Sequence, residues 1–432
     1  MAILRISIAA ALTISSFQLF ASNSLADEWP QWGGPQRDLI WRETGIVKKL
    51  PVEGKLLPRV WSAPIGEGYA GPAVANGRVI ITDRIRKRNV ERVLCLGAKS
   101  GKEIWKHEYE ARYTVSYPAG PRSTPVVNDG CVYTIGAVGH MFCFEEETGK
   151  VIWEKNFVDE YNTKLPIWGM VASPLVDGDQ LITLVGGPNA LVVSFNRKTG
   201  KELWRSLNSQ GVGYAPPVIF EFGGVRQLII WHPEAVESID PTTGKPIWKI
   251  PYRVRAGLSI ATPRKFGNML FVASFYNGPR MIKVADDGLS AKIEWKGDSD
   301  NEIKTSGVHP IMCIPYFDGT HIYSVCSFGQ LRCLNAKDGS RVWETEAATG
   351  SGRWWNAFLI RHEKRFFIHN EQGELIIANL TPSGYEETSR ALLVEPTRPV
   401  RRRQTIWSHP AFAMKSVFAR NDKEIVRVNL AE

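Results

Sequence analysis

The stretch KSGKEIW at residues 99–105 decides the fold, because it returns at a nearly constant interval along the chain. Its close copies are TGKVIW (148–153), TGKELW (199–204), TGKPIW (243–248) and DGSRVW (338–343), with a weaker copy, DGLSAKIEW, at 287–295. The closing tryptophans follow one another every 44 to 51 residues. A repeat of this length is typical of an architecture that stacks one small structural unit many times.

The residues around each copy predict what the unit is. A strand containing a proline comes first, as in GPAVANGRVIITD (71–83), STPVVNDGCVYTIG (123–136), ASPLVDGDQLITLVGG (172–187) and ATPRKFGNMLFVAS (261–274). An NG, DG or GN pair then marks a tight hairpin turn, since these residues tolerate the positive φ that such turns need. A third strand and the TGKxxW turn lead to a fourth. Four antiparallel strands in every unit predict an all-β protein with the fold of a β-propeller.

Counting the first strands gives eight blades, which begin near residues 69, 121, 170, 213, 259, 306, 354 and 406. The last blade is short, and we expect the segment 55–65 to supply its outer strand, with Trp61 in the position of the repeat tryptophan. A propeller of seven blades with additions is the alternative, because the seventh unit has lost its TGKxxW. We expect the repeat tryptophans to fill the gaps between blades; they are Trp61, Trp105, Trp153, Trp204, Trp248, Trp295 and Trp343.

The N-terminus carries the features of a secretory signal peptide. Arg5 precedes a largely apolar run, and small residues end it before a cleavage site at Ala26. We therefore expect a signal peptide at 1–26, an N-terminal arm at 27–54 and a propeller at 55–432. We expect the protein to be periplasmic or secreted, because no other stretch of the sequence could span a membrane. We expect a monomer. The arm opens with WPQWGGPQRD (29–38), whose extended composition suggests that it covers one mouth of the central funnel or caps the closing blade.

The charge of the chain bears on its possible partners. The formal net charge is +9, with basic runs at 84–88 and 398–403 that we read first as solvated loops. Nucleic acid is not an expected partner of an exported protein.

Six cysteines are present, and three of them recur at one repeat position, which favours packing within strands. Pairing within a hairpin, as Cys131–Cys143 or Cys326–Cys333, stays open.

The repeat resembles the tryptophan-docking motif of pyrroloquinoline quinone (PQQ) propellers, on GAKSGKEIW, NRKTGKELW and NAKDGSRVW. That group includes quinoprotein alcohol dehydrogenases and a propeller lipoprotein of the outer-membrane assembly machinery, and the opening WPQWGGPQRD resembles exported PQQ-like repeat proteins. The resemblance covers 28–430 and implies the fold. It also implies two functions, an oxidoreductase with PQQ over Ca²⁺ held by Glu and Asn beside a catalytic Asp, or a scaffold for envelope proteins.

Aligning the first strands predicts which residues face the funnel. The alignment uses Pro72, Pro125, Pro174, Pro217, Pro263, Pro310 and Pro410, with Ala357 in the seventh unit. No Asp or Glu stands one position before any of these aligned residues, and none stands three positions before. This absence of carboxylates argues against a Ca²⁺ site in the funnel. Asp83, Glu234 and Glu371 are the carboxylates expected nearest the rim. The predicted rim is aromatic and polar, and its candidate binding residues are Tyr69, Arg122, Tyr214, His232, His309, Trp354, Trp355, Asn356, Trp407 and His409.

These residues favour binding over catalysis. We predict no catalytic residue, no metal site and no cofactor, because no known hydrolase or nucleotide motif is present and the three histidines His232, His309 and His409 lack a paired spacing. The favoured interpretation is an exported binding or scaffold protein that holds a cell-envelope protein or a saccharide at the funnel rim. The alternatives are a quinoprotein oxidoreductase that uses PQQ with Ca²⁺, and a carbohydrate-binding propeller.

Overall fold

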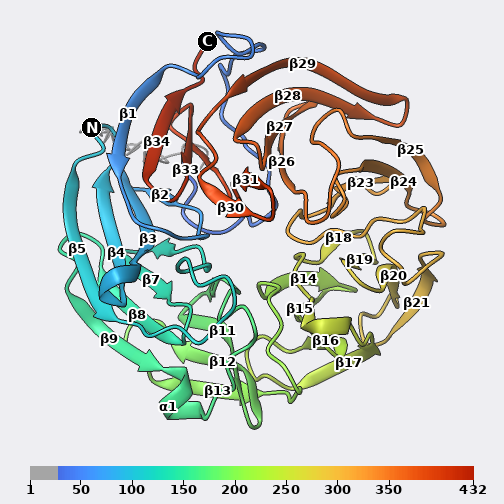
Figure 1. The fold of residues 1–432 in the computed structure, drawn as a ribbon. Helices are drawn as coiled ribbons and strands as arrows, with labels where there is room; N and C mark the ends of the chain where they lie inside the picture. Colours follow the sequence, from blue (N-terminus) through green and yellow to red (C-terminus); the bar gives the residue numbers. More distant parts are fainter. Residues whose placement is uncertain (1–27) are drawn as a thin grey trace, which may run out of the picture.

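Eight four-stranded antiparallel sheets stand in a ring around a central axis (Figure 1). The structure is a computed structural model that describes residues 28–432, so the predicted signal peptide at 1–26 lies outside the described residues. The prediction of an eight-bladed β-propeller is confirmed, and the alternative of seven blades is wrong. Among the described residues no helix is long and apolar enough to cross a membrane.

Each of the first seven blades takes four consecutive strands. Blades one to four are formed by β2 (Ala73–Ala75), β3 (Arg78–Ile85), β4 (Val90–Gly97) and β5 (Glu103–Glu110); β6 (Val126–Asn128), β7 (Cys131–Ile135), β8 (His140–Glu145) and β9 (Val151–Asn156); β10 (Leu175–Asp177), β11 (Gln180–Gly187), β12 (Ala190–Asn196) and β13 (Glu202–Ser206); β14 (Val218–Phe222), β15 (Val225–His232), β16 (Ala235–Ile239) and β17 (Pro246–Pro251). Blades five to seven are formed by β18 (Arg264–Phe266), β19 (Met269–Ser274), β20 (Gly278–Val284) and β21 (Ala291–Lys296); β22 (Tyr316–Phe317), β23 (His321–Val325), β24 (Leu331–Asn335) and β25 (Arg341–Thr345); β26 (Ala357–His362), β27 (Arg365–Asn370), β28 (Glu374–Thr381) and β29 (Gly384–Leu392).

Blade eight joins the two ends of the chain. It contains β32 (Ala411–Ala413), β33 (Ser416–Arg420) and β34 (Glu424–Asn429), and its outer strand is β1 (Arg59–Pro64). β1 runs antiparallel to β34, and an ion pair of 2.8 Å between Arg59 and Glu424 spans the two strands. This pairing covers the edge of β34, which would otherwise be open.

Short elements occupy the connections between strands. They are the helix α1 (Phe157–Tyr161), the 3₁₀ turns η2 (Arg86–Arg88) and η3 (Arg255–Gly257), and the hairpin of β30 (Arg398–Val400) and β31 (Arg403–Thr405). The hairpin lies inside blades seven and eight, toward the ring centre (Figure 1).

A tryptophan of one blade docks on the turn of the next blade. The indole nitrogen of Trp105 donates to the carbonyl of Glu146 at 2.8 Å. The ring covers Gly149, where an added Cβ would lie 2.5 Å from Trp105. Trp61 of blade eight donates in the same way to Ala98 of blade one at 2.9 Å, so the docking continues across the closure. The glycine of the TGKxxW turn is therefore needed both for its positive φ and for this close approach.

All six cysteines are buried and none forms a disulfide. Burial raises the pKa of the thiols of Cys95 and Cys313 to about 12. Thiols this reluctant to ionise act as small apolar side chains in the blade interfaces.

The N-terminal arm, residues 28–54, crosses one end of the ring. Trp29 pairs with Val74 of β2, and the carbonyl of Pro30 accepts a hydrogen bond of 2.8 Å from Val127 of β6. The buried guanidinium of Arg37 then donates to the carbonyls of Pro174 (3.0 Å) and Pro217. Four neighbouring blades are thus tied together by the nine arm residues from Trp29 to Arg37.

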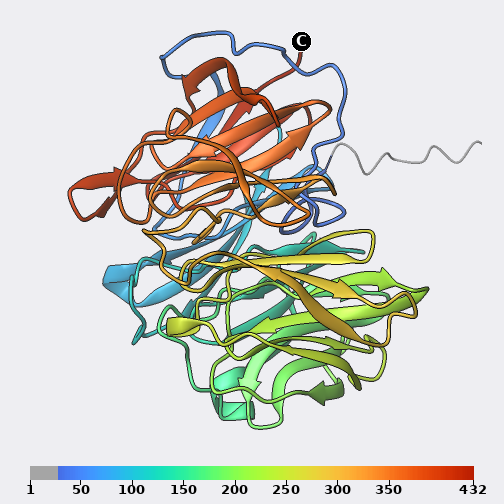
Figure 2. The same cartoon turned by 90° about the vertical axis from the view of Figure 1, so that its right-hand side faces the viewer.

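Farther along, the arm reaches the blades on the opposite side of the axis. Trp41 donates its backbone N–H to Arg361 of β26 at 2.8 Å, and His362 lies 2.8 Å from the carbonyl of Glu43. All these contacts fall within the first strand of a blade or directly before it, and in Figure 2 the blue trace of the arm lies on the right-hand side of the ring. We call this side the arm end and the opposite side the pocket end.

Candidate functional site

A cavity of about 450 Å³ opens at the pocket end of the central axis. Its wall takes one side chain from each of the eight blades, three residues before the residue that directly precedes or begins the first strand. The eight residues are Tyr69, Arg122, Val171, Tyr214, Ile260, Met312, Trp354 and Trp407.

The residues of the cavity wall show that the sequence alignment of the sixth blade was wrong. The sequence alignment used Pro310, but β22 begins at Tyr316, directly after Pro315. In the other blades the aligned position directly precedes the first strand or begins it. The long connection before β22 contains two prolines, and the first of them was mistaken for the strand start. Met312 and Ile314 therefore line the cavity in place of Gly307 and His309.

The structure brings together six of the ten predicted binding residues. Tyr69, Arg122, Tyr214, Trp354, Trp407 and His409 all line the cavity. The other four do not line it. His232 is buried within blade four, 3.0 Å from Glu237, and His309 lies 2.8 Å from the carbonyl of Phe275.

The remaining two of these four belong to the segment before β26. Trp355 is buried beneath the guanidinium of Arg403, whose carbon lies 5.1 Å from the ring centroid. Asn356 is 1% exposed, and neither its amide nitrogen nor its amide oxygen has a hydrogen-bond partner among the described residues.

The floor of the cavity is supplied by the arm. Trp32 is 7% exposed and donates its indole N–H to Thr262 at 3.1 Å. Its ring packs edge to face against His409. Burial, together with the neighbouring His369, holds the pKa of His409 well below its ordinary value, so this imidazole is neutral near pH 7. The arm therefore closes the channel that would otherwise run through the ring.

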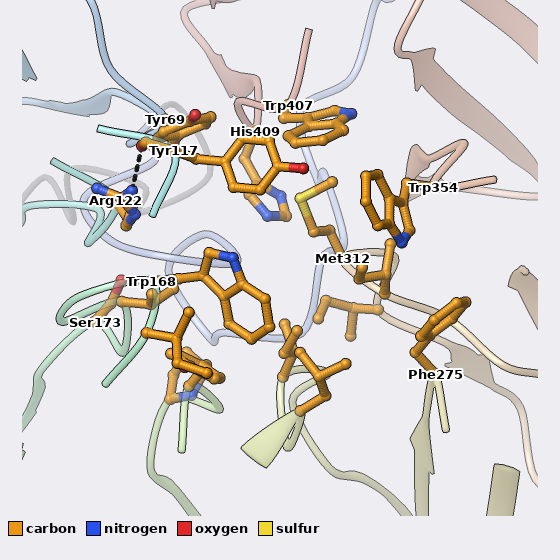
Figure 3. Close-up of a pocket in the computed structure, with 18 of the residues that line it drawn as sticks. Tyr69, Tyr117, Arg122, Trp168, Ser173, Phe275, Met312, Trp354, Trp407 and His409 are labelled. Atoms are coloured by element: carbon orange, nitrogen blue, oxygen red, sulfur yellow. Dashed lines mark hydrogen bonds between the residues drawn. The ribbon is translucent and has the colours of Figure 1, made fainter. Parts of the chain in front are cut away.

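Aromatic rings meet at the mouth of the cavity, where Tyr117, Trp354 and Trp407 converge (Figure 3). The ring centroid of Tyr117 lies 5.8 Å from that of Trp407 and 6.4 Å from that of Trp354. Tyr117 and Trp354 both have positive φ, at 52° and 71°. This conformation is uncommon for large side chains, and such strain concentrates at functional sites.

Sequence reasoning missed several lining residues because they lie in connections and not in strands. Tyr117 and Trp168 belong to the long segments between the outer strand of one blade and the inner strand of the next, and Trp168 points into the cavity (Figure 3). Trp32 belongs to the arm. The available signal was a large aromatic residue in a connection longer than a turn requires.

Arg122 is the cation that lines the wall. Its guanidinium donates to the backbone carbonyls of Ser116 (2.9 Å) and Tyr117 (2.5 Å), the second of which is drawn in Figure 3. It forms no ion pair with any residue in the described part of the chain, and burial lowers its pKa. Burial also raises the pKa of Tyr214 to about 12, so this phenol stays protonated.

The lining contains neither Asp nor Glu. The three carboxylates expected near the rim do not line the cavity. Asp83 pairs with Arg92 at 2.6 Å, Glu234 accepts the backbone N–H of Gln210 at 3.2 Å, and Glu371 accepts from the indole of Trp407 at 3.1 Å and from Arg403. Ca²⁺ is held by several oxygen ligands, usually with carboxylates among them. The residues of this cavity therefore do not fit a PQQ–Ca²⁺ group. Within residues 28–432, no group of three or more His, Cys, Asp or Glu side chains has the arrangement of a metal site.

Comparison with known proteins connects this geometry to a family. The family model described as outer membrane protein assembly factor BamB matches residues 89–218 and 232–432. The chain belongs to this family. The resemblance to PQQ-type propellers proposed from the repeat is confirmed, because the relatives include both BamB proteins and quinoprotein alcohol dehydrogenases.

One curated relative of each kind, a quinoprotein dehydrogenase and a BamB protein, shows the extent of the similarity. The quinoprotein ethanol dehydrogenase of Pseudomonas aeruginosa is 27% identical over 152 residues, which is 31% of this chain and 23% of that protein. The outer membrane protein assembly factor BamB of Burkholderia pseudomallei is 22% identical over 226 residues, which is 50% of this chain and 53% of that protein. The chain thus spans about a quarter of the first of these relatives and about half of the second.

Solved structures share the fold at low identity. The crystal structure of BamB from Moraxella catarrhalis has a TM-score of 0.58 and 15% identity, covering 86% of this chain and 97% of that one. The quinohemoprotein alcohol dehydrogenase ADHIIG from Pseudomonas putida HK5 has a TM-score of 0.60 and 12% identity, covering 94% of this chain and 80% of that one. At these identities the likeness concerns the fold, which serves both kinds of protein.

Proposed function

We propose that this protein is a non-catalytic binding protein of the cell envelope that holds a partner in the aromatic cavity of its pocket end. The observation that carries the proposal is the composition of the wall, in which one side chain from each blade forms a ring without a carboxylate. A concave, mainly apolar site with few polar groups is typical of binding sites. The family, which is named for an envelope assembly factor, supports the envelope as the location.

The chemistry of the lining favours binding over catalysis. A general base must be able to accept a proton near the working pH. Burial keeps His409 neutral but also makes it a weak base, and it keeps the phenol of Tyr214 protonated. The quinoprotein alternative is supported by the relatives alone, because the lining lacks the oxygen ligands that Ca²⁺ requires.

The lining also disfavours a saccharide. Sugar hydroxyls need hydrogen-bonding partners when they leave water, and leaving them without partners is costly. The hydroxyls of Thr124 and Ser173 lie at the wall, but Ser173 already accepts the backbone N–H of Thr124 at 3.0 Å. Arg122 has committed its guanidinium to backbone carbonyls. An apolar or aromatic side chain of a protein partner fits these surroundings better.

Site-specific photocrosslinking tests the proposal. A photoreactive phenylalanine analogue is placed at Tyr117 on the cavity mouth and, as a matched control, at Ile152, which is 47% exposed on the outer strand of blade two. We expect a discrete crosslinked protein in intact cells from the Tyr117 position that the Ile152 position does not give. Loss of the crosslink in a Trp354→Ala background would tie it to the cavity.

A calorimetric titration separates the rival function. A ligand that binds the native state raises the melting temperature by mass action. If PQQ with Ca²⁺ raised the melting temperature in a saturable way and Tyr117 gave no crosslink, the proposal would be wrong and the oxidoreductase would replace it.

A further inference from the structure

The two basic runs singled out in the sequence lie beside the cavity mouth. Arg398 of the β30–β31 hairpin lies over the ring of Tyr69, with its guanidinium carbon 4.1 Å from the centroid. It also donates to the carbonyl of Gly68 at 3.3 Å. On the other side of this segment, Arg86 of η2 forms an ion pair with Glu67. Both basic runs therefore flank residues 67–69, which lead directly into the cavity wall.

Several cations of this surface have no acidic partner. Among the described residues, Lys87, Arg401 and Arg402 form no ion pair, and all three are exposed. Two of the acidic side chains nearby are already engaged, since Asp422 pairs with Arg398 and Glu371 pairs with Arg403. Glu395, which is exposed just before the hairpin, forms no ion pair within residues 28–432, and it is outnumbered by the three unpaired cations. The surface thus carries an excess of positive charge next to an apolar cavity. We call Lys87, Arg401 and Arg402 the basic rim.

The basic rim is directly connected to the aromatic mouth. The guanidinium carbon of Arg401 lies 4.5 Å from the ring centroid of Trp354, which lines the cavity. Arg401 also holds a positive φ of 55° at the hairpin tip, a position that usually takes Gly or Asn. A ligand in the cavity would therefore meet Arg401 as it leaves the mouth.

We propose that the cavity and the basic rim form one site for an acidic peptide segment of a partner protein, with an apolar or aromatic side chain in the cavity and carboxylates at Lys87, Arg401 and Arg402. This inference rests on the proposed function and adds the chemistry of the partner. Complementary charge selects the partner and speeds association, while a buried anchor residue supplies most of the affinity.

Fluorescence anisotropy tests the proposal with a labelled peptide that carries one Trp among Asp and Glu residues. Two comparison peptides replace the Trp by Ala or the acidic residues by Lys. We expect the acidic Trp peptide to bind most tightly, and its affinity to fall as salt is added. The variant Arg401→Glu/Arg402→Glu should weaken it by about tenfold or more.

A matched variant controls for net charge. Lys198→Glu/Lys201→Glu makes the same change of charge in the TGKxxW turn of blade three, at the arm end and away from the hairpin, and both lysines are exposed. We expect it to leave the affinity within about twofold, because charges farther than a Debye length are screened. An unchanged melting temperature of the Arg401→Glu/Arg402→Glu variant shows that its loss of affinity is not due to misfolding.

The remaining outcomes overturn the inference in distinguishable ways. If the acidic and basic Trp peptides bound equally, or if Arg401→Glu/Arg402→Glu bound normally, recognition of acidic residues would be wrong while binding in the cavity stood. If phosphatidylglycerol vesicles or heparin bound more tightly than the peptide and displaced it, the site would belong to a lipid or a glycan. If no peptide bound and Tyr117 gave no crosslink, both this inference and the proposed function would fail.

Discussion

Trp32 of the N-terminal arm and His409, which directly precedes blade eight, pack edge to face with ring centroids 3.8 Å apart and planes inclined by 87°. These residues are separated by almost the whole chain, yet together they form the floor of the cavity. The arm therefore contributes to the candidate site and also connects blades across the ring.

Replacing Trp32 by Ala should destabilise the protein. Truncating a buried Trp removes apolar contacts and leaves a void, which costs about 3–5 kcal/mol. Here the hydrogen bond to Thr262 is lost as well. Urea unfolding of Trp32→Ala should show this loss of unfolding free energy. Trp168→Ala is the control, because Trp168 is only partly buried at the mouth. Equal, small losses in the two variants would show that the arm does not support the fold.

The stability of the protein should fall in mild acid because of His369. Its Nδ1 lies 3.1 Å from the carbonyl of Glu374, and its Nε2 has no partner among the described residues. Burial lowers the pKa of His369 to about 4, whereas an unfolded histidine titrates near 6.5. Between these values the unfolded chain binds more protons, so the stability that is complete above about pH 6.5 is lost as the pH falls, by about 1.4 kcal/mol per pH unit.

Urea unfolding at pH 7.5 and pH 5 measures this contribution. His369→Gln removes the titration, so the wild type should lose about 2 kcal/mol more than this variant between the two pH values. Buried histidines that do not neighbour His369 affect both proteins alike and cancel in the difference. His409 neighbours His369, but its pKa is lowered first by its own burial, which both proteins share. The control is His321→Gln, which replaces a half-buried histidine at the start of β23. Parallel losses in wild type and His369→Gln would contradict the assignment.

The fold was predictable because it depends on local and periodic signals. The hairpin turns, the proline-containing strands and the TGKxxW turns each act within a few residues, and their period sets the number of blades. The same period also predicted most of the cavity wall. The residues identified in this way from the sequence are Tyr69, Arg122, Tyr214, Trp354 and Trp407.

The rest of the site depends on features that the repeat does not encode. Met312 was missed because two prolines precede β22, and the period alone does not select between them. Trp32 enters from the arm, and Tyr117 from a connection that has no counterpart of equal length in other blades. Asn356 occupies a predicted rim position but is buried and does not line the cavity. The residues at that position differ in this respect, since Thr124 and Ser173 line the cavity whereas Thr262 does not.

The thiols should be unreactive in the folded protein. All six cysteines are buried, and burial raises the pKa of several of them, as at Cys95 and Cys313. A thiol reagent reacts with the exposed thiolate, so native protein should react slowly. Protein unfolded in guanidinium without reductant should then show six reactive thiols. A count of four would instead indicate one of the hairpin disulfides, Cys131–Cys143 or Cys326–Cys333.

Tryptophan docking between blades can be tested with two glycines of blade two that have nearly the same backbone conformation. Gly149 has a φ of +73° and Gly130 a φ of +72°. An added methyl group at Gly149 would lie 2.5 Å from the ring of Trp105, whereas at Gly130 nothing lies within 4 Å. Both Ala variants bear the cost of a left-handed residue, about 1–2 kcal/mol.

Only Gly149→Ala must also displace the indole of Trp105 and its hydrogen bond to Glu146. Overpacking of this kind costs a further 1–3 kcal/mol or so. Urea unfolding should therefore rank Gly149→Ala well below Gly130→Ala in stability. In a Trp105→Ala background the two glycine substitutions should cost about the same, because the clash is gone. Equal stabilities of the two single variants would mean that the indole can move aside freely, and that the repeat tryptophan does not hold neighbouring blades together.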